Sequence, residues 1–306
     1  MFWRRRTLIL LGIGLLAIVA TAAAVAFAGD ESATEPHAAG AACRGDASRS
    51  VPQPTPAELA AAGLGELPLA PRSARVDLVS PPFANPTEIT NPLFPISELH
   101  SAILNGAVDG KAFKVETTLL PGTRTIGWGE GRCVETLASQ YVAYLDGRLH
   151  EVALDFYAQA DDGSVWYLGE DVFNYEDGVV ADRLGTWIAG RDGPGAMIMP
   201  GTPKVGNAYR PENIPGLVFE EVAVSEIAKT VAGPRGPIRG AMVGRELHDD
   251  GTFSDKVFAP GHGEPKGTPG TPTAGSRPSP TCSTASSSTR TPTGAAGSSP
   301  TATPSG

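Results

Sequence analysis

The chain has 306 residues and carries 24 lysines and arginines against 33 aspartates and glutamates, a formal net charge of −9. An acidic chain without basic clusters argues against binding to nucleic acids and to anionic membrane surfaces. Roughly 185 residues lie between the terminal segments described below, which is enough for one domain with a sizeable core.

Residues 1–28 have the features of a signal peptide or membrane anchor. Three arginines precede an uncharged run from Thr7 to Ala28, and Ala26-Phe27-Ala28 fits a small-x-small cleavage site. The run is also long enough to span a bilayer, so cleavage and retention both remain open. In either case the arginines stay inside, and we expect the rest of the chain to be extracytoplasmic, either secreted or anchored.

Residues 29–80 are rich in alanine and proline and predict a stalk with one short helix at 56–62. Thr55 is the predicted N-cap, Pro56 starts the first turn, Glu58 completes a capping box and Gly63 ends the helix. At the other end, residues 265–306 are rich in serine, threonine and proline. Such a segment cannot bury apolar surface, so we predict a disordered tail.

Six Asp-Gly pairs between residues 109 and 251 determine the predicted fold. Asp-Gly favours tight hairpin turns, because both residues tolerate the positive φ angles that these turns need. The segments between the pairs are rich in Val, Leu, Phe, Tyr and Trp. We therefore predict that residues 81–264 form a mainly β domain. Its antiparallel meander would make a curved sheet, either a half-barrel or a sandwich.

The turn at 146–147 predicts a register for the first hairpin. A two-residue turn pairs Leu145 with Arg148 and, further along, Tyr141 with Val152. One face then collects Leu137, Tyr141, Leu145, Val152, Leu154 and Phe156, and the other holds Thr136, Gln140, Glu151, Asp155 and Gln159.

An exported chain permits disulfide bonds, and this one has three cysteines. Cys43 and Cys133 flank or enter the predicted domain, whereas Cys282 lies in the tail. We predict a bond between Cys43 and Cys133. The alternative is three free thiols.

Several segments resemble a family of uncharacterised exported bacterial proteins, many of them lipoprotein-like. The resemblance covers about residues 91–264. It implies export and a β fold but no activity or catalytic residue. The segments are Asn91-Pro92-Leu93-Phe94-Pro95, the run Asp155–Asp171 with Tyr175-Glu176-Asp177-Gly178 and Gly185-Thr186-Trp187, Met199-Pro200, Pro203-Lys204-Val205-Gly206 with Tyr209-Arg210, and Phe258-Ala259-Pro260-Gly261.

This chain departs from the family at two places. Ile96–His100 stands where relatives tend to have a strand, and Pro265-Lys266-Gly267 leads into the tail where they tend to have another. The second departure predicts that the sheet lacks an edge strand, or that the tail is a shifted reading frame.

Enzyme signatures are mostly absent from the sequence. It has no Gly-x-Ser-x-Gly nucleophile motif, no complete phosphate-binding loop and no His-Glu-x-x-His motif. His150-Glu151 with Asp155, and His248-Asp249-Asp250, lack the spacing of metal ligands on one face. We therefore expect no metal and no cofactor, and an enzyme is the less favoured interpretation.

The candidate site comes from extending the register through the turns at 162–163 and 177–178. The first turn pairs Asp155 with Glu170, the second pairs Val172 with Arg183, and together they place aromatic side chains on the same face as the acids. One interpretation is a groove with an acid pair and aromatic platforms for a ligand. The other is a partly solvated face on which Arg183 neutralises the acids and the aromatic side chains cover a second layer. The candidate ligand-binding residues are Tyr157, Trp166, Trp187 and Arg183, and the weak catalytic candidates are Asp155 and Glu170.

Three classes of function remain open. The favoured one is a non-enzymatic exported domain that binds a small apolar or glycan ligand, or an envelope component, and meets the membrane only through its N-terminal segment. The second is a structural or adhesion module presented on stalks. The third is a glycan hydrolase that uses Asp155 and Glu170. Neither the ligand nor the oligomeric state follows from the sequence.

Overall fold

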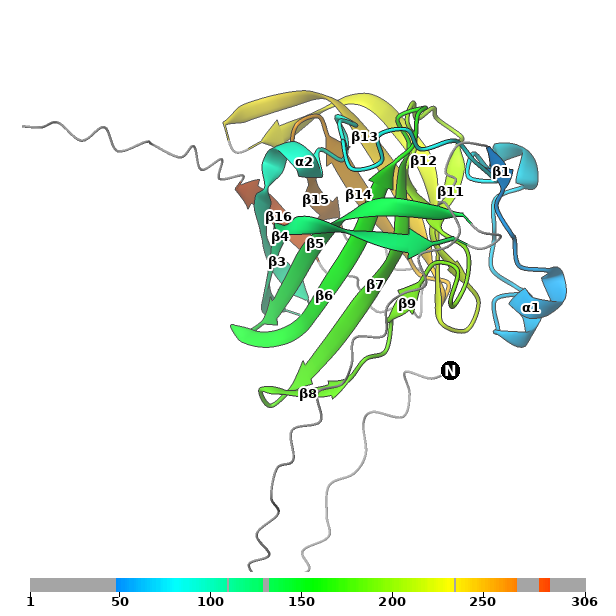
Figure 1. Ribbon diagram of the computed structural model, residues 1–306. Helices are drawn as coiled ribbons and strands as arrows, with labels where there is room; N and C mark the ends of the chain where they lie inside the picture. The colour runs from blue at the N-terminus through cyan, green and yellow to red at the C-terminus, as the bar shows by residue number, and fades with distance from the viewer. Residues whose placement is uncertain (1–47, 109, 129–131, 234, 269–280, 287–306) are drawn as a thin grey trace, which may run out of the picture. The chain divides into compact units, whose positions relative to one another are not determined.

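Two antiparallel sheets face each other in the folded part of the protein (Figure 1). The computed structural model describes residues 48–108, 110–128, 132–233, 235–268 and 281–286. All of them belong to one compact unit, Ala41–Gly306.

The first sheet has the strand order β10-β7-β6-β5-β4-β3-β16, and the short strands β8 and β9 also pair with β7. Its strands are β3 (Ser101–Val108), β4 (Lys111–Gly127), β5 (Cys133–Leu145), β6 (Arg148–Gln159), β7 (Val165–Glu176), β8 (Val179–Asp182), β9 (Trp187–Ile188), β10 (Ala196–Met199) and β16 (Thr281–Ser286).

The second sheet has the order β11-β12-β13-β14-β15. Its strands are β11 (Ala208–Ile214), β12 (Val218–Gly233), β13 (Gly236–His248), β14 (Phe253–Ala259) and β15 (Gly263–Thr268). Outside the two sheets lie the ribbon of β1 (Arg49–Ser50) and β2 (Val79–Ser80), the helices α1 (Pro56–Ala61) and α2 (Ile96–Leu99), and the 3₁₀ helix η2 (Arg72–Ala74).

The predicted antiparallel meander is confirmed, because consecutive strands pair from β3 to β7 and from β11 to β15. Two of the Asp-Gly turns have the backbone geometry expected of tight hairpin turns. At 146–147 and 177–178 both residues have positive φ, with values of 50° and 74° in the first turn and 51° and 82° in the second. The mainly β, antiparallel fold class therefore holds.

Helix α1 also forms as its capping residues predict. The Thr55 hydroxyl accepts a hydrogen bond from the Glu58 backbone amide at 3.2 Å, and the Glu58 carboxylate accepts one from the Thr55 amide at 2.7 Å. Gly63 follows with φ of +80°, so the helix stops where the sequence indicates.

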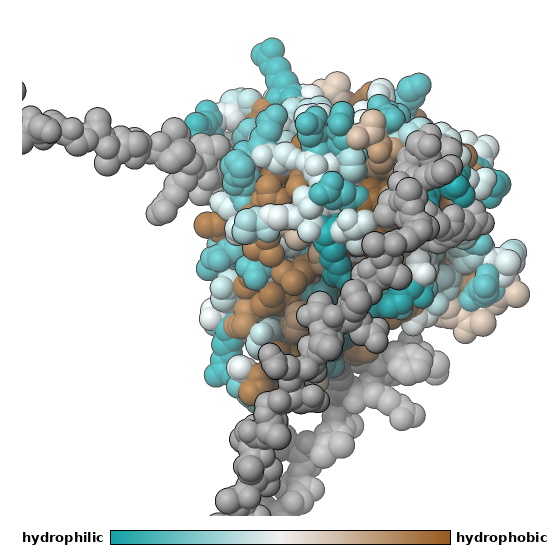
Figure 2. Space-filling model, viewed as in Figure 1, coloured by the Kyte–Doolittle hydropathy of each residue, from teal (hydrophilic) through white to brown (hydrophobic). Residues whose placement is uncertain are grey.

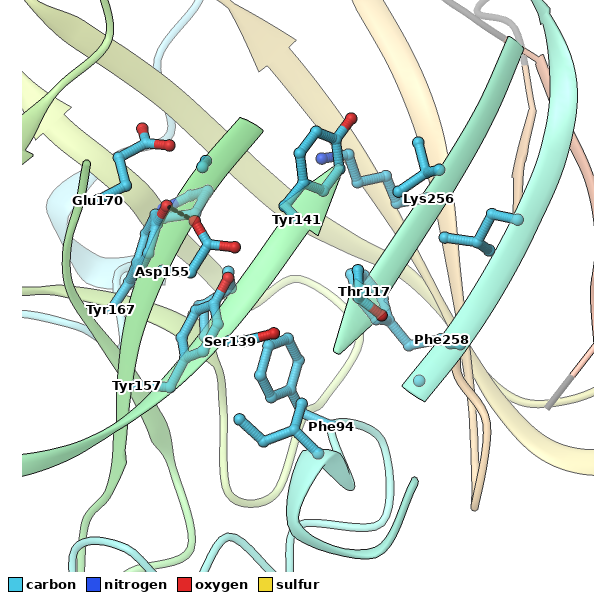
Figure 3. A pocket seen from close by; sticks show the side chains of 18 of the residues that line it. Phe94, Thr117, Ser139, Tyr141, Asp155, Tyr157, Tyr167, Glu170, Lys256 and Phe258 are labelled. Carbon is cyan, nitrogen blue, oxygen red and sulfur yellow. Dashed lines mark hydrogen bonds between the residues drawn. The ribbon is translucent and has the colours of Figure 1, made fainter. Parts of the chain in front are cut away.

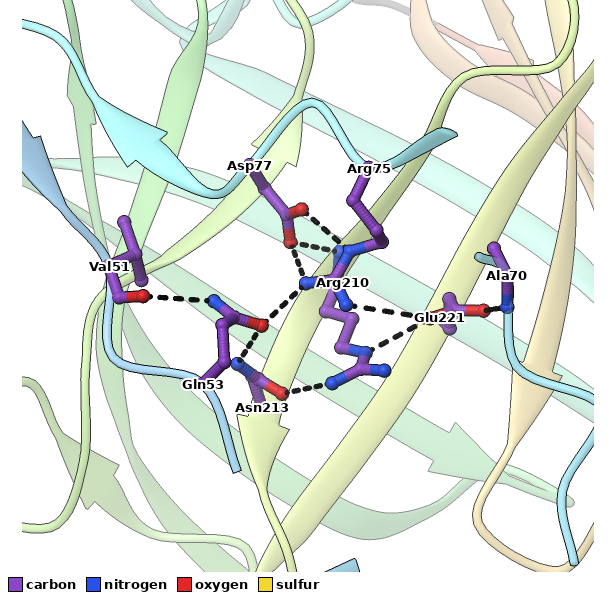
Figure 4. A network of polar contacts seen from close by, with 8 residues as sticks. All are labelled: Val51, Gln53, Ala70, Arg75, Asp77, Arg210, Asn213 and Glu221. Carbon is purple, nitrogen blue, oxygen red and sulfur yellow. Dashed lines mark hydrogen bonds and ion pairs between the residues drawn. The ribbon is translucent and has the colours of Figure 1, made fainter. Parts of the chain in front are cut away.

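The predicted stalk is wrong for residues 48–80, which pack onto the second sheet. Arg75 and Asp77 are buried and join Arg210 and Glu221 in a network of two positive and two negative groups (Figure 4). Asp77 accepts from Arg75 Nε at 2.7 Å and from the Arg210 backbone amide at 2.9 Å, while Glu221 accepts from Arg210 Nε at 3.0 Å. Because ion pairs help to hold the segment in place, its low apolar content does not indicate this packing.

The prediction of a disordered tail is wrong for two short segments. Residues 263–268 form β15 against β14, and residues 281–286 form β16 against β3. Backbone hydrogen bonds at an open sheet edge do not depend on side-chain type, so a polar sequence can supply an edge strand. The expectation that the second sheet lacks its last strand is corrected in the same way.

Some predictions concern residues 1–47, which lie outside the described residues. They include the leader at 1–28 and Cys43, so the bond between Cys43 and Cys133 stays a prediction. Cys133 itself is half-buried at the start of β5. None of the described helices combines the length and apolar character that crossing a membrane requires.

The register of the first hairpin differs from the prediction by one residue. Leu145 pairs with Arg148 as expected, but an irregularity beside His150 pairs Tyr141 with Ala153 instead of Val152. Beyond this irregularity, each residue of β5 pairs with the residue next to its predicted partner, so the predicted faces of β6 are reversed relative to β5. Ser139 and Tyr141 of β5 therefore share a face with Glu151 and Asp155 of β6, and this face is turned toward the interior.

We predict that Asp77→Ala destabilises the protein by about 3–5 kcal/mol, because it leaves Arg75 and Arg210 buried beside a single carboxylate. Urea unfolding measures the change. The control is Glu226→Ala, which removes half of the exposed Lys229–Glu226 pair and should stay within about 1 kcal/mol of wild type. Equal effects of the two substitutions would show that the network does not hold residues 48–80.

Candidate functional site

A cavity of about 410 Å³ lies between the facing sheets. Its size is within the range of small-molecule sites. Strands of both sheets and helix α2 line it, and Figure 3 shows side chains from several of these elements. The ionisable side chains in its lining are Glu151, Asp155, Glu170, Glu212, Glu220, Glu246, Lys256 and His262, and the aromatic ones are Phe94, Tyr141, Tyr157, Tyr167, Tyr209 and Phe258.

A bulge in β7 places two of these side chains in the cavity. Asp155 pairs with Glu170, as the turn at 162–163 predicts, but Tyr157 pairs with Tyr167, so β7 has one extra residue between the two pairs. Gly169 lies in this bulge with φ of +125°, and a Cβ there would clash with the backbone carbonyl of Trp187. As a result both Tyr167 and Glu170 face inward.

The Asn-Pro-Leu-Phe-Pro segment positions one end of the cavity. Asn91 donates to the carbonyls of Gly163 at 2.8 Å and Pro200 at 3.1 Å, and its backbone amide donates to the Gln159 side chain at 2.8 Å. These bonds fix the chain just before Phe94, which lines the cavity together with Ile96 and Leu99 of α2. The asparagine of the motif therefore has a structural role, while its phenylalanine contributes to the cavity lining.

Aromatic rings form a row along this end of the site. Phe94 meets Tyr157 edge-on at 5.0 Å between ring centroids, Tyr157 stacks on Tyr167 at 4.9 Å, and Tyr167 meets Trp187 edge-on at 5.3 Å. Such pairs prefer offset and edge-on geometry, which holds the two tyrosines rigidly.

Four carboxyl groups, Glu151, Asp155, Glu170 and Glu212, form what we call the acidic wall. Asp155 accepts a hydrogen bond from the Tyr167 hydroxyl at 2.8 Å (Figure 3) and is also hydrogen-bonded with Tyr157. Glu170, on the first sheet, is hydrogen-bonded with Glu212, on the second. The wall therefore bridges the two sheets through groups of like charge.

The acidic wall resists ionisation. Burial, with a further contribution from Glu151, raises the pKa of Asp155 to about 7, although the tyrosine hydrogen bonds lower it. Burial and the charge of Asp155 raise the pKa of Glu170 to about 8. Burial also raises the pKa of Glu151, and that of Glu212 well above its ordinary value. The wall can therefore hold protons at neutral pH.

On the second sheet, Glu220, Glu246, His248 and Lys256 form what we call the balanced cluster. Lys256 Nζ lies 2.9 Å from Glu246 Oε1, and His248 Nδ1 lies 3.1 Å from Glu220 Oε1. Burial opposes ionisation of Glu220, but the hydrogen bond with His248 and the charge of Lys256 lower its pKa to about 2. Here the acids have cationic partners.

The balanced cluster also contains three side chains of types that can bind a metal ion. One ligand atom each from Glu220, Glu246 and His248 lie within 4.8 Å of one another. The sequence groups His248 with Asp249 and Asp250, but its partners are Glu220 of β12 and Glu246 of β13. Since Lys256 lies against Glu246, a charge-balanced network accounts for this group without an ion.

The structure brings together only part of the sequence-predicted site. Asp155, Glu170 and Tyr157 line the cavity. Trp166 does not, because the bulge turns it to the other face of β7, where it is fully buried against Trp128. Trp187 pairs with Glu170 but is fully buried behind Tyr167.

The predicted position of Arg183 is also wrong. It is exposed, forms an ion pair with Asp171 and lies over the Phe173 ring. It therefore does not neutralise Asp155 and Glu170, as one interpretation of the sequence required. Its predicted pairing with Val172 assumed an uninterrupted register, whereas β8 ends at Asp182 opposite Asn174.

Apolar side chains also gather on the surface over β5 and β6 and are bordered by polar ones (Figure 2). By alternation Val152 and Leu154 lie on the face opposite Ala153 and Asp155. The guanidinium of Arg124 covers the ring of Phe156 on that face at 4.5 Å. Acids and tyrosines thus face the cavity, while aliphatic residues of β6 face away from it.

Comparison with known proteins does not assign the chain to a family. No protein-family model matches the chain, and no curated protein or solved structure is significantly similar to it.

We predict that stability falls as the pH rises from 5 to 9. A carboxyl whose pKa is raised on folding stabilises the folded state below its unfolded pKa near 4, and this contribution is lost as the pH passes the folded pKa of about 7 to 8. Asp155→Asn keeps an acceptor for Tyr167 but cannot ionise. At pH 8 it should therefore be more stable than wild type by about 1–3 kcal/mol, with little gain at pH 5.

Urea unfolding at both pH values tests this expectation. The exposed Asp250 is the control position, because Asp250→Asn keeps the turn hydrogen bond to Thr252 and should shift stability little at either pH. An equal loss of stability at pH 5 and pH 8 in Asp155→Asn would show that the protein needs this carboxylate in its ionised form.

Proposed function

We propose that this protein is an exported, non-enzymatic β-domain that binds a small ligand in the cavity between its two sheets. The observation that carries the proposal is the cavity itself, whose lining combines rigid aromatic rings with polar groups held beside them. Sites for small molecules typically combine an apolar lining with a few fixed polar groups.

The energetic cost of the acidic wall supports binding over a purely structural role. A fold selected only for stability would fill this space with aliphatic side chains, because buried like charges are costly. Functional sites are where such costs are commonly retained. A module that only presents a surface on stalks does not need the cavity.

The location outside the cytoplasm rests on the sequence of residues 1–28. The arginines followed by an uncharged run support export, and so does the resemblance to exported bacterial proteins. Cell fractionation of the native host tests this part, and recovery of the intact chain from the cytosol would overturn it.

A glycan hydrolase is the second candidate, favoured by the direct pairing of Asp155 with Glu170. A retaining glycosidase needs one ionised carboxylate beside one protonated acid. Here burial raises the pKa of both groups, and tyrosines hold Asp155 from two sides. This arrangement supports binding more than nucleophilic attack. Loss of glycan hydrolysis in Asp155→Asn would favour the enzyme.

We predict that the folded protein binds an uncharged, environment-sensitive dye such as N-phenyl-1-naphthylamine with enhanced fluorescence. Thr117→Trp should abolish this signal, because Thr117 lines the cavity and an indole would fill it. The matched control is Thr125→Trp on the same strand, where the side chain is exposed and binding should persist. Absence of dye binding to wild type, or equal binding to both variants, contradicts a ligand site in this cavity.

A further inference from the structure

The charges around the cavity are unevenly compensated. In the balanced cluster, two carboxylates face Lys256 and His248 at ion-pair distance. In the acidic wall, the hydrogen-bond partners of Asp155 and Glu170 are tyrosines or other carboxyl groups. Within the described ranges, no ion pair joins the acidic wall to a lysine, arginine or histidine, although the charge of Lys256 acts on Glu212 from a distance.

The rings beside the acidic wall suit a positively charged group. Tyr157 and Tyr167 stack on each other and are both hydrogen-bonded with Asp155, so their positions are fixed relative to the carboxyl. The face of an aromatic ring attracts a cation, and the attraction grows when water is excluded. Carboxylates and tyrosine rings together form the kind of lining that recognises an organic ammonium group.

The end of the cavity away from the acidic wall is mainly apolar, although Lys256 and His262 also line the cavity. Phe94 meets Tyr157 on the side away from Asp155, and Ile96, Leu99 and Phe258 continue the lining (Figure 3). The cavity therefore has one end formed by the acidic wall and another where apolar side chains predominate. A metal ion would satisfy the carboxyls but leave the aromatic and aliphatic end without an occupant.

We propose that the ligand is an amphiphile with a cationic nitrogen, an alkylamine or alkylammonium compound, whose nitrogen lies against Asp155, Glu170 and Glu212 and whose apolar part lies between Phe94 and Phe258. This inference rests on the proposed ligand-binding function. It adds the chemical class of the ligand and the end of the cavity that recognises each part.

A series of three ten-carbon compounds tests the proposal, with decyltrimethylammonium, decanol and decanoate each displacing the dye at pH 8. We expect the cation to bind about tenfold or more tightly than decanol, and decanoate to bind more weakly than both. Equal affinities of the cation and decanol would overturn the inference and leave the proposed function intact. If none of the three displaces the dye and native mass spectrometry detects no complex, the proposed function fails as well.

Substitutions in the acidic wall identify the residues responsible for the preference for a cation. Glu170→Gln and Asp155→Asn should reduce the affinity for decyltrimethylammonium to that for decanol while leaving decanol binding unchanged. The control is Glu135→Gln on the exposed face of β5, which removes the same charge away from the cavity and should preserve the preference. Retention of the full cation preference in both cavity variants would overturn the assignment. A loss of decanol binding in a variant would show that its fold is damaged. The affinities of the wild-type protein for the three compounds would then decide whether the cation preference exists.

The pH gives an independent measurement, because decyltrimethylammonium does not titrate. Its affinity should rise between pH 6 and 8 as the acidic wall ionises, while decanol binding stays nearly constant. The ionisable side chains outside the wall that line the cavity are Glu220, Glu246, Lys256 and His262, and His248 lies beside Glu220 and Glu246. Glu170→Gln should flatten the rise, whereas Glu135→Gln should not. An equal rise for decanol would contradict the proposal.

Discussion

The bulge at Gly169 decides which side chains of β7 reach the interior. A strand that alternates strictly would turn either Tyr167 or Glu170 outward, since they are three residues apart. With the extra residue both face the cavity, and Trp166 is buried on the other face. Only glycine fits the position, because its φ is positive and the Trp187 carbonyl lies against it. The aromatic row and the acidic wall both depend on this one irregularity.

Turn chemistry and hydrophobic alternation predict most of the fold. The Asp-Gly turns give the meander and the pairing of Asp155 with Glu170, and Thr55 with Glu58 gives helix α1. The site is predicted less well, because a single inserted residue reverses every face beyond it. Gly169, one residue before Glu170 in a strand of aromatic and aliphatic residues, was the available signal for a bulge. The position of Glu212 had no such signal, since periodicity cannot show how one sheet packs on another.

The arrangement of polarity also explains why simple patterning misleads here. An amphipathic strand normally turns its aliphatic residues inward. In β6 the inward residues are Glu151, Ala153, Asp155 and Tyr157, while Val152 and Leu154 lie on the other face. Burial raises the pKa of both acids, so the fold accepts an energetic cost inside its cavity. In the balanced cluster, the histidine and the lysine lower the pKa of Glu220 to about 2, whereas burial still raises that of Glu246 to about 7.

The buried network of Arg75, Asp77, Arg210 and Glu221 has a consequence for the order of folding. The Asp77 carboxylate accepts the amide of a residue 133 positions later in the chain. Arg75 and Asp77 leave the ribosome early, but they cannot lose their hydration until β11 and β12 have paired. This segment can therefore take its final place only after strands made much later have formed, and such distant contacts slow the search for the native state.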